Sequence, residues 1–383
     1  MLLISLSAFF ADLGYQTALA IFPIFLVITL KAPAYEFGLA NAIAFGIGSM
    51  FGYAGGLLND RFDGKWVAVA GNAFIPLISL VGLASSPVTA IALFSGGWWA
   101  RNFRSPPRRA MLASSSSEAD RSRVFGFLHA LDIGGGMVSI MILVLLLLYG
   151  LGFKDILLLT ALPLAISTLL LLFSSSNSKA NGRRQSTQSL QKAQPAKIKS
   201  STYKGIIIAT LLYGFSSYSL GFPIITIAQT SSSLLGIASY GIYLGVSAFA
   251  GYYIGAKKLN RIRALGLAGY LLSGLATLML GIAYILHAGV AVFYISVAIL
   301  GFSLGAIETI EPTIISLIKG ARNIGRGMGS LSASRSIGIF FANIIMGLLY
   351  VLNPSYSYIY SGIISIAAAA IVLYMGRGFR SSA

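Results

Sequence analysis

Long apolar segments recur along the entire chain and limit what it can fold into. The chain has 383 residues, of which 56% are hydrophobic and only 10% are charged, and its mean hydropathy is +0.83. Soluble chains carry about 25% charged residues, so this composition excludes a soluble enzyme and a nucleic-acid-binding domain. A membrane span needs about 20 mostly apolar residues. We therefore expect an all-α polytopic membrane protein.

The length rule predicts twelve transmembrane helices. The expected spans are 2–29, 37–58, 66–84, 87–105, 122–149, 155–174, 204–230, 233–256, 264–286, 289–318, 327–352 and 355–376. The first apolar run lacks a basic leader and contains Asp12, so we interpret it as a span and not as a signal peptide.

The basic residues predict the orientation of these spans. The chain carries 27 Lys and Arg against 10 Asp and Glu, a net charge of +17. With a cytoplasmic N-terminus, only Lys31 and Lys154 fall on the opposite side, Arg335 falls inside a span, and the other 24 basic residues lie on the cytoplasmic face. This positive-inside pattern predicts that both termini are cytoplasmic. The excess charge then indicates contact with anionic lipid headgroups, not with nucleic acid.

Several chemistries lack the residues that they need. Without cysteine, the chain has no disulfide, thiol nucleophile or cysteine-ligated metal. The two histidines, His129 and His287, are too few for a histidine metal cage, so we expect no metal and no cofactor. No phosphate-binding loop occurs, so ATP is excluded as a direct energy source.

Residues 175–203 interrupt the apolar pattern with a Ser-, Gln- and Lys-rich stretch. Such a composition buries little surface and predicts a flexible cytoplasmic linker. It separates two six-span bundles, 1–174 and 204–383.

The two halves also resemble each other. The matched positions are Gly14 with Gly214 and 22–24 with 222–224 at an offset of 200, and Arg123 with Arg326, Gly126 with Gly329 and Asp132 with Arg335 at an offset of 203. Transporters built from such repeats bind substrate between the halves near the midplane.

Three segments resemble a known family. The sequence GLLNDRFDGK at 56–65 resembles the G-x-L-x-D-R-x-G-R/K signature of the major facilitator superfamily, with Asp63 as one extra residue. Segments 101–110 and 121–132 are similar to a prokaryotic subgroup of largely uncharacterised permeases of that superfamily. The resemblance covers essentially the whole chain. It implies two pseudo-symmetric six-helix bundles, a monomer in the cell membrane, and transport of a small molecule by alternating access, with no enzymatic activity.

Ionisable residues inside spans are costly and are candidates for function. We expect Asp12, Glu308 and Glu311 to couple transport to protons or cations. Glu308 and Glu311 face one side of their helix, and a structural pairing with Arg101 or Arg104 is an open alternative. Asp12 has no obvious partner in its own helix, which makes it the preferred coupling acid.

Two further groups of residues complete the predicted site. The expected cytoplasmic gate contains Asp60, Arg61, Arg101, Arg104, Arg108, Asp132 and Arg335. Within it, Asp132 and Arg335 occupy equivalent repeat positions with opposite charge, which predicts an ion pair between the halves. The resemblance places spans one and seven at the central cavity, and the cavity candidates there are Tyr15, Gln16, Tyr213, Ser216, Ser217, Tyr218 and Gln229.

The sequence favours a secondary active transporter of a small solute, driven by protons. Its aromatic cavity candidates favour export of amphipathic organic compounds over uptake of a metabolite. An uncoupled uniporter or lipid flippase, in which the acids serve only gating, is the alternative. A remote alternative is an intramembrane aspartyl protease using Asp12 and Asp132, but no matching motif surrounds either residue.

Overall fold

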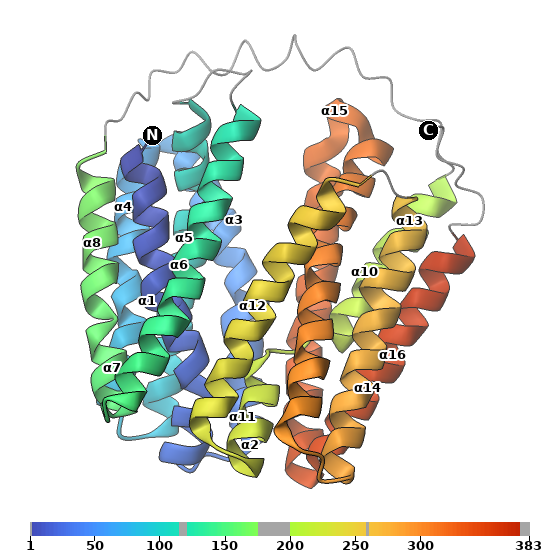
Figure 1. Cartoon of the computed structure of the whole chain (residues 1–383). Helices are drawn as coiled ribbons and strands as arrows, with labels where there is room; N and C mark the ends of the chain where they lie inside the picture. Colours follow the sequence, from blue (N-terminus) through green and yellow to red (C-terminus); the bar gives the residue numbers. More distant parts are fainter. Residues whose placement is uncertain (1, 115–120, 175–199, 258–259, 376–383) are drawn as a thin grey trace. The chain divides into compact units, whose positions relative to one another are not determined.

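The computed structural model describes residues 2–114, 121–174, 200–257 and 260–375, and these are almost entirely helical (Figure 1). The elements are α1 (Leu2–Ile24), η1 (Phe25–Thr29), α2 (Ala34–Asn41), η2 (Ala42–Ile47), α3 (Gly48–Arg61), α4 (Gly64–Phe74), η3 (Ile75–Leu83), α5 (Pro87–Ser114), α6 (Arg121–Leu148), α7 (Phe153–Leu159), α8 (Ala161–Leu172), α10 (Ser200–Ser216), α11 (Gly221–Thr230), α12 (Ser233–Gly255), α13 (Arg261–Ala264), η5 (Leu265–Leu271), α14 (Leu272–Ile285), α15 (Val290–Leu352) and α16 (Pro354–Met375).

Eleven of the described segments are long and apolar enough to cross a membrane. The multi-pass architecture is therefore confirmed. The remaining predicted span, 87–105, lies within α5, a helix of 28 residues. Arg101 and Arg104 interrupt its apolar sequence, so it falls below the hydropathy of the other spans. The count of twelve and the cytoplasmic termini stay predictions.

Helix α15 carries two spans in one run of helical backbone. It is 63 residues long and contains the membrane-spanning segments Val290–Ile315 and Ser330–Leu352. A straight helix would place Glu311 and Arg335 about 36 Å apart, yet their side chains are hydrogen-bonded across 24 residues. The chain must therefore reverse direction between them, and Figure 1 shows this reversal beside the α15 label.

The chain divides into two compact units. The first comprises Met1–Gly182 with Ala228–Gly241, and the second comprises Arg183–Ile227 with Ile242–Ala383. The first unit thus includes the beginning of α12, which the predicted boundary assigns to the second half. Most of the predicted linker lies outside the described residues, so the boundaries 1–174, 175–203 and 204–383 stay predictions.

Each unit uses a glycine to bring two helices together. In the first unit α6 packs on α1, and a Cβ added at Gly135 would lie 2.4 Å from the Phe9 carbonyl oxygen. In the second unit α15 packs on α10, and a Cβ at Gly338 would lie 2.5 Å from the Gly214 carbonyl carbon. Gly135 and Gly338 are separated by the same offset of 203 that relates Asp132 to Arg335. The repeat seen in the sequence is therefore also present in the packing.

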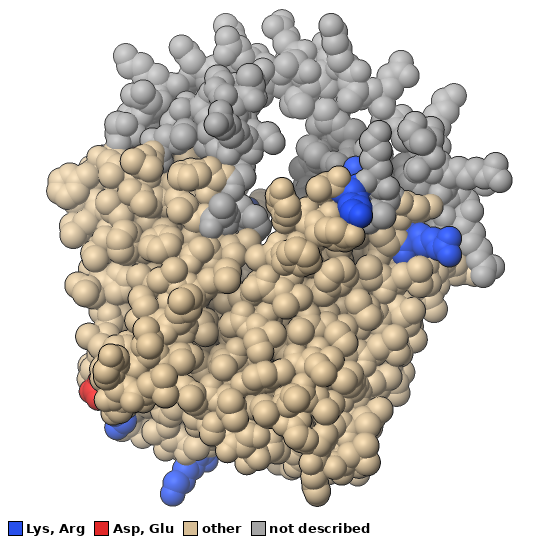
Figure 2. Space-filling model, viewed as in Figure 1, with Lys and Arg blue, Asp and Glu red and all other residues tan. Residues whose placement is uncertain are grey.

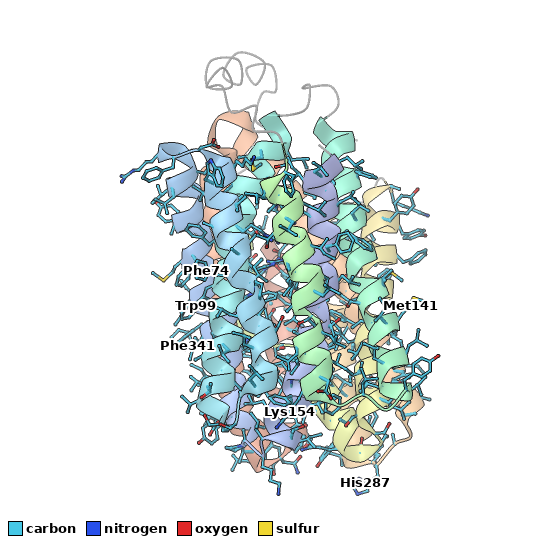
Figure 3. All side chains as sticks on the ribbon, turned by 90° about the vertical axis from the view of Figure 1, so that its left-hand side faces the viewer. Phe74, Trp99, Met141, Lys154, His287 and Phe341 are labelled. Carbon is cyan, nitrogen blue, oxygen red and sulfur yellow. The ribbon has the colours of Figure 1, made fainter. Side chains whose placement is uncertain are left out.

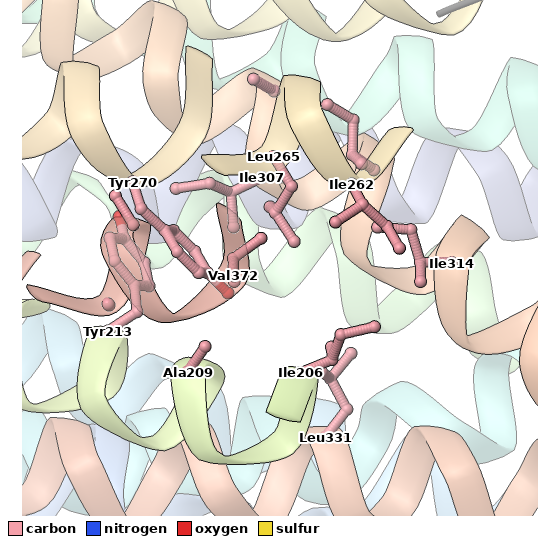
Figure 4. Close-up of a cluster of buried hydrophobic side chains, with 14 of the residues drawn as sticks. Ile206, Ala209, Tyr213, Ile262, Leu265, Tyr270, Ile307, Ile314, Leu331 and Val372 are labelled. Carbon is pink, nitrogen blue, oxygen red and sulfur yellow. The ribbon is translucent and has the colours of Figure 1, made fainter. Parts of the chain in front are cut away.

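The units have apolar interiors and apolar outer surfaces. In the second unit, Ile206, Tyr270 and Ile307 belong to one buried cluster from α10, η5 and α15 (Figure 4). On the face shown in Figure 2, charged side chains of the described residues are confined to the ends of the helices. Phe74 and Met141 point outward in Figure 3 and are 61% and 66% exposed. Such exposure of large apolar side chains fits contact with lipid tails.

Candidate functional site

Asp12 is a buried carboxylate on α1 that makes no ion pair in the described part of the chain. It is 3% exposed. The Tyr15 hydroxyl donates a hydrogen bond to Asp12 Oδ1, and Gln16 Nε2 donates a hydrogen bond to the same oxygen at 3.4 Å. Asp12 Oδ2 has no hydrogen-bond partner there, and no described Lys or Arg lies within salt-bridge distance. The expectation that Asp12 lacks a partner in its own helix was wrong, because residues three and four positions later lie on the same face.

Arg101 lies beside the same tyrosine. Its guanidinium carbon is 5.3 Å from the centre of the Tyr15 ring and 4.9 Å from the centre of the Trp98 ring, within the range of cation–π attraction. Nη2 lies 3.5 Å from the Tyr15 hydroxyl, and Nη1 donates to Asn102 Oδ1 at 3.2 Å. Its Nε is buried without an acceptor among the described residues. Arg101 is half-buried and forms no salt bridge with them.

Arg104 and Arg108 continue the same face of α5, because residues three and seven positions after Arg101 lie along one stripe. Arg104 is fully buried, and its Nη1 donates to Asn72 Oδ1 at 2.7 Å. Arg108 is 4% exposed and pairs with Asp132 at 3.5 Å. The gate role of these arginines stays a prediction, and the structure places two of them in the interior of the first unit.

The second unit contains a more completely paired cluster. Arg335 forms salt bridges with both Glu308 and Glu311. The hydroxyl of Tyr270, from η5, donates a hydrogen bond to Glu311. Glu311 is fully buried, whereas Glu308 is 54% exposed. The predicted alternative partners of the glutamates were Arg101 or Arg104; the partner in the structure is Arg335.

The two clusters share one ion pair with exchanged charges. Arg108 bonds to Asp132 and Glu311 bonds to Arg335, each pair 24 residues apart. The offset of 203 carries Arg108 onto Glu311 and Asp132 onto Arg335. The helix starts obey the same offset, since α5 begins at Pro87 and α15 at Val290. Each of these four charged residues thus has a partner within its own unit. The Asp132–Arg335 pair between the halves stays a prediction.

Three charged residues of this part of the first unit have no charged counterpart in the second. Arg101 and Arg104 correspond to Leu304 and Ile307 at the offset of 203, and Asp12 corresponds to Leu212 at the offset of 200. These positions are where the two repeats differ chemically.

The cavity candidates fall into separate groups. Gln16 lies next to Asp12, and its Oε1 accepts a hydrogen bond from Tyr240 at 2.6 Å; Tyr240 belongs to the part of α12 grouped with the first unit. Ser216, Ser217 and Tyr218 lie where the helix is interrupted between α10 and α11.

Local hydrogen bonds occupy the hydroxyl groups at this interruption. Ser216 and Ser217 both donate to the Tyr213 carbonyl, and the Tyr218 hydroxyl lies 3.2 Å from Thr277 Oγ1. Gln229 is exposed near the end of α11, about 12 Å along that helix from its start. The structure does not bring Gln229 together with the other candidates.

Asp60 and Arg61 end α3 and are exposed, with no ion pair among the described residues. The extra residue of the motif, Asp63, has a local role. It is the N-cap of α4, and its Oδ1 accepts a hydrogen bond from the Lys65 backbone nitrogen at 2.9 Å. The gate role of Asp60 and Arg61 stays a prediction.

Two contributing residues were missed from the sequence. Asn72 holds Arg104, and Tyr270 holds Glu311. Both are polar groups inside apolar spans, and that setting is the only indication that the sequence carries.

Comparison with known families agrees with this architecture. The sequence model of the Major Facilitator Superfamily matches residues 4–283. This chain belongs to the major facilitator superfamily. Members of the superfamily are transporters, so this chain is a multi-pass membrane transporter of that superfamily.

Solved structures share the fold of this superfamily member. A POT family transporter in complex with a thioalcohol-conjugated peptide aligns with a TM-score of 0.78 and 13% identity over 97% of this chain and 95% of that one. A D-xylose–proton symporter aligns with a TM-score of 0.77 and 13% identity over 99% and 98%. A bacterial homologue of the human lysosomal transporter Spinster aligns with a TM-score of 0.74 and 14% identity over 100% and 98%. No curated protein sequence matches.

Proposed function

We propose that this chain is a proton-coupled secondary transporter of a small solute that works by alternating access, with Asp12 as the group that carries the proton. The observation that supports this is the burial of Asp12 without an ion pair among the described residues. Ionisable groups inside membrane spans are costly and mark function. Asp12 Oδ2, which has no hydrogen-bond partner there, is the atom that can accept the proton without breaking an existing bond.

The glutamates of the second unit suit this task less well. Protonating Glu311 would break its salt bridge with Arg335 and disturb the bond from Tyr270. Removing one partner of a buried ion pair costs about 3–5 kcal/mol. Asp12 avoids this cost, because its bonds come from neutral hydroxyl and amide groups. We therefore assign Glu308 and Glu311 to holding the two spans of α15 together.

The test uses purified protein in liposomes with an imposed pH gradient and a pH dye inside. Carboxylic acids, amphipathic amines, amino acids and sugars are added one at a time. We expect one class to trigger proton flux, and Asp12→Asn to abolish that flux while solute exchange continues. Asp155→Asn, at an exposed carboxylate of α7, is the matched control and should retain the flux.

Two results would contradict the proposal. Unchanged proton flux in Asp12→Asn would remove this residue from the coupling. Solute movement without proton flux in the unaltered protein would favour the uniporter or flippase alternative, in which buried acids serve only gating.

A further inference from the structure

The first unit concentrates buried guanidinium groups that lack acceptors. Among the described residues, five buried guanidinium nitrogens of α5 have no hydrogen-bond partner: Nε of Arg101, Nε and Nη2 of Arg104, and Nε and Nη1 of Arg108. Among the described residues of the second unit, Arg335 Nε is the only buried guanidinium nitrogen without a hydrogen-bond partner. Most buried polar groups in proteins are hydrogen-bonded, and leaving one unpaired is costly. A row of such donors on one helix face suits an anion.

The charges around Asp12 have a positive excess. Asp132 on α6 and Arg101 and Arg108 on α5 act on it electrostatically, and Arg104 lies between these arginines on the same helix face. The sequence of α8, which also packs on α1, contains no charged residue. Tyr15 and Tyr240 are the nearby phenols, and the side chain of His129 on α6 lies outside the described residues. Three arginines and two aspartates leave this cluster with a net charge of +1.

We propose that Arg101, supported by Arg104, binds an anionic group of the transported solute, a carboxylate or a phosphate, and that this anion and the proton on Asp12 are carried together. The inference rests on the proposed function and names its substrate class. Arg101 is the partly exposed member of the row next to Asp12, whereas Arg104 and Arg108 are buried. The rings of Tyr15 and Trp98 hold its guanidinium in a defined orientation. A guanidinium in fixed orientation binds carboxylate or phosphate through two parallel hydrogen bonds.

The sign of the coupling follows from the charge of the cluster. With Asp12 ionised the net charge is +1, and with Asp12 protonated it is +2. Protonation therefore strengthens anion binding, and by thermodynamic linkage anion binding strengthens protonation. A cationic solute would instead compete with the proton, as in antiport. The cluster thus favours symport of an amphipathic or polar anion, driven as uptake by an inward proton gradient, over the predicted export.

The chain provides its own reporter for a binding test. It has three tryptophans, Trp66, Trp98 and Trp99, and the Trp98 ring lies 4.9 Å from the Arg101 guanidinium. Replacing Trp66 and Trp99 with Phe leaves Trp98 as the only indole. Because Trp99 Nε1 donates to the Ile43 carbonyl at 3.0 Å, the single variant Trp66→Phe is titrated alongside, which covers a loss of folding in the double variant.

The full chain in detergent is titrated with hexanoate, hexylammonium and inorganic phosphate at pH 6 and pH 8, and Trp98 fluorescence is followed. We expect a saturable fluorescence response to hexanoate. The affinity for hexanoate should be higher at pH 6 than at pH 8, by up to about tenfold per pH unit for one linked proton. Arg101→Gln should abolish it, and Asp12→Asn should bind tightly at both pH values. Lys154→Gln, at an exposed lysine of α7, should leave it unchanged.

The outcomes separate this inference from the proposed function. Phosphate binding that is as tight as hexanoate binding and depends on Arg101 would support the anion site with a free inorganic anion as its occupant. No saturable response to either anion, an equal response in Arg101→Gln, or equal affinity at both pH values would overturn the inference. Proton flux triggered in liposomes by hexylammonium and unaffected by Arg101→Gln would overturn it while keeping coupled transport. Anion binding that depends on Arg101 without any solute-triggered proton flux would keep the site and overturn the proposed function.

Discussion

The two units bury an ion pair at equivalent positions with reversed polarity, Arg108 with Asp132 in the first and Glu311 with Arg335 in the second. The second unit adds Glu308 and Tyr270 around its arginine and leaves few polar atoms unpaired. The first unit adds Asp12, Arg101 and Arg104, whose equivalents in the second are leucine or isoleucine. An Arg–Asp pair and a Glu–Arg pair both have zero net charge, so the shared ion pair can join two spans in each repeat with either polarity. The chemistry that distinguishes the two units lies in the charges that have no equivalent in the other unit.

The largest expected effect concerns the burial of the pair in the second unit. Glu311→Ala leaves Arg335 with only the exposed Glu308 and should lower the free energy of unfolding by about 3–5 kcal/mol. Glu308→Ala should cost about 0–1 kcal/mol, because this carboxylate is 54% exposed. Thermal unfolding in detergent measures both. Equal losses would show that burial does not distinguish the two glutamates.

A charge exchange in the first unit tests whether polarity is interchangeable. Arg108→Asp and Asp132→Arg, made singly, each place two like charges together and should destabilise the unit. Made together they reproduce the polarity of the second unit and should recover at least half of the lost stability and transport. The double reversal of Asp132 and Arg335 is the comparison that tests the predicted pair between the halves. If the double reversal of Asp132 and Arg335 restored stability and transport while that of Arg108 and Asp132 did not, the pairing of Arg108 with Asp132 within the first unit would be contradicted.

A smaller effect than the loss of a buried ion pair is expected at the caps that begin the third span of each repeat. Asp63 caps α4 through the Lys65 nitrogen at 2.9 Å, and Asn260 caps α13 through the Arg263 nitrogen at 3.2 Å. Asp63→Ala and Asn260→Ala should each lower the free energy of unfolding by about 0.5–2 kcal/mol. Asp60→Ala, in the last turn of α3 and without a capping bond among those described, is the control. A clearly larger loss for Asp63 than for Asn260 would indicate that the inserted residue does more than cap.

The sequence identifies the charged residues inside the spans but not their contacts. The offset of 203 identified Asp132 and Arg335 as equivalent positions, but equivalence in a repeat does not mean proximity. Their partners within each unit are Arg108 and Glu311, which occupy the neighbouring span of the same repeat. The twelve predicted spans likewise gave no indication that two of them form one run of helical backbone in α15.

The sequence by itself determined that this chain is a multi-pass membrane protein built from two related halves, because apolar length and glycine spacing are local properties of the chain. It also identified the charges inside the spans, because a charged residue within an apolar run can be recognised without knowing its partners. Only the tertiary structure decided that Arg335 is shared by two glutamates. It also decided that Arg101 lies beside the rings of Tyr15 and Trp98 and forms no salt bridge with a carboxylate of the described residues. Those outcomes depend on which helix faces meet, and helix packing brings together residues that no sequence spacing connects.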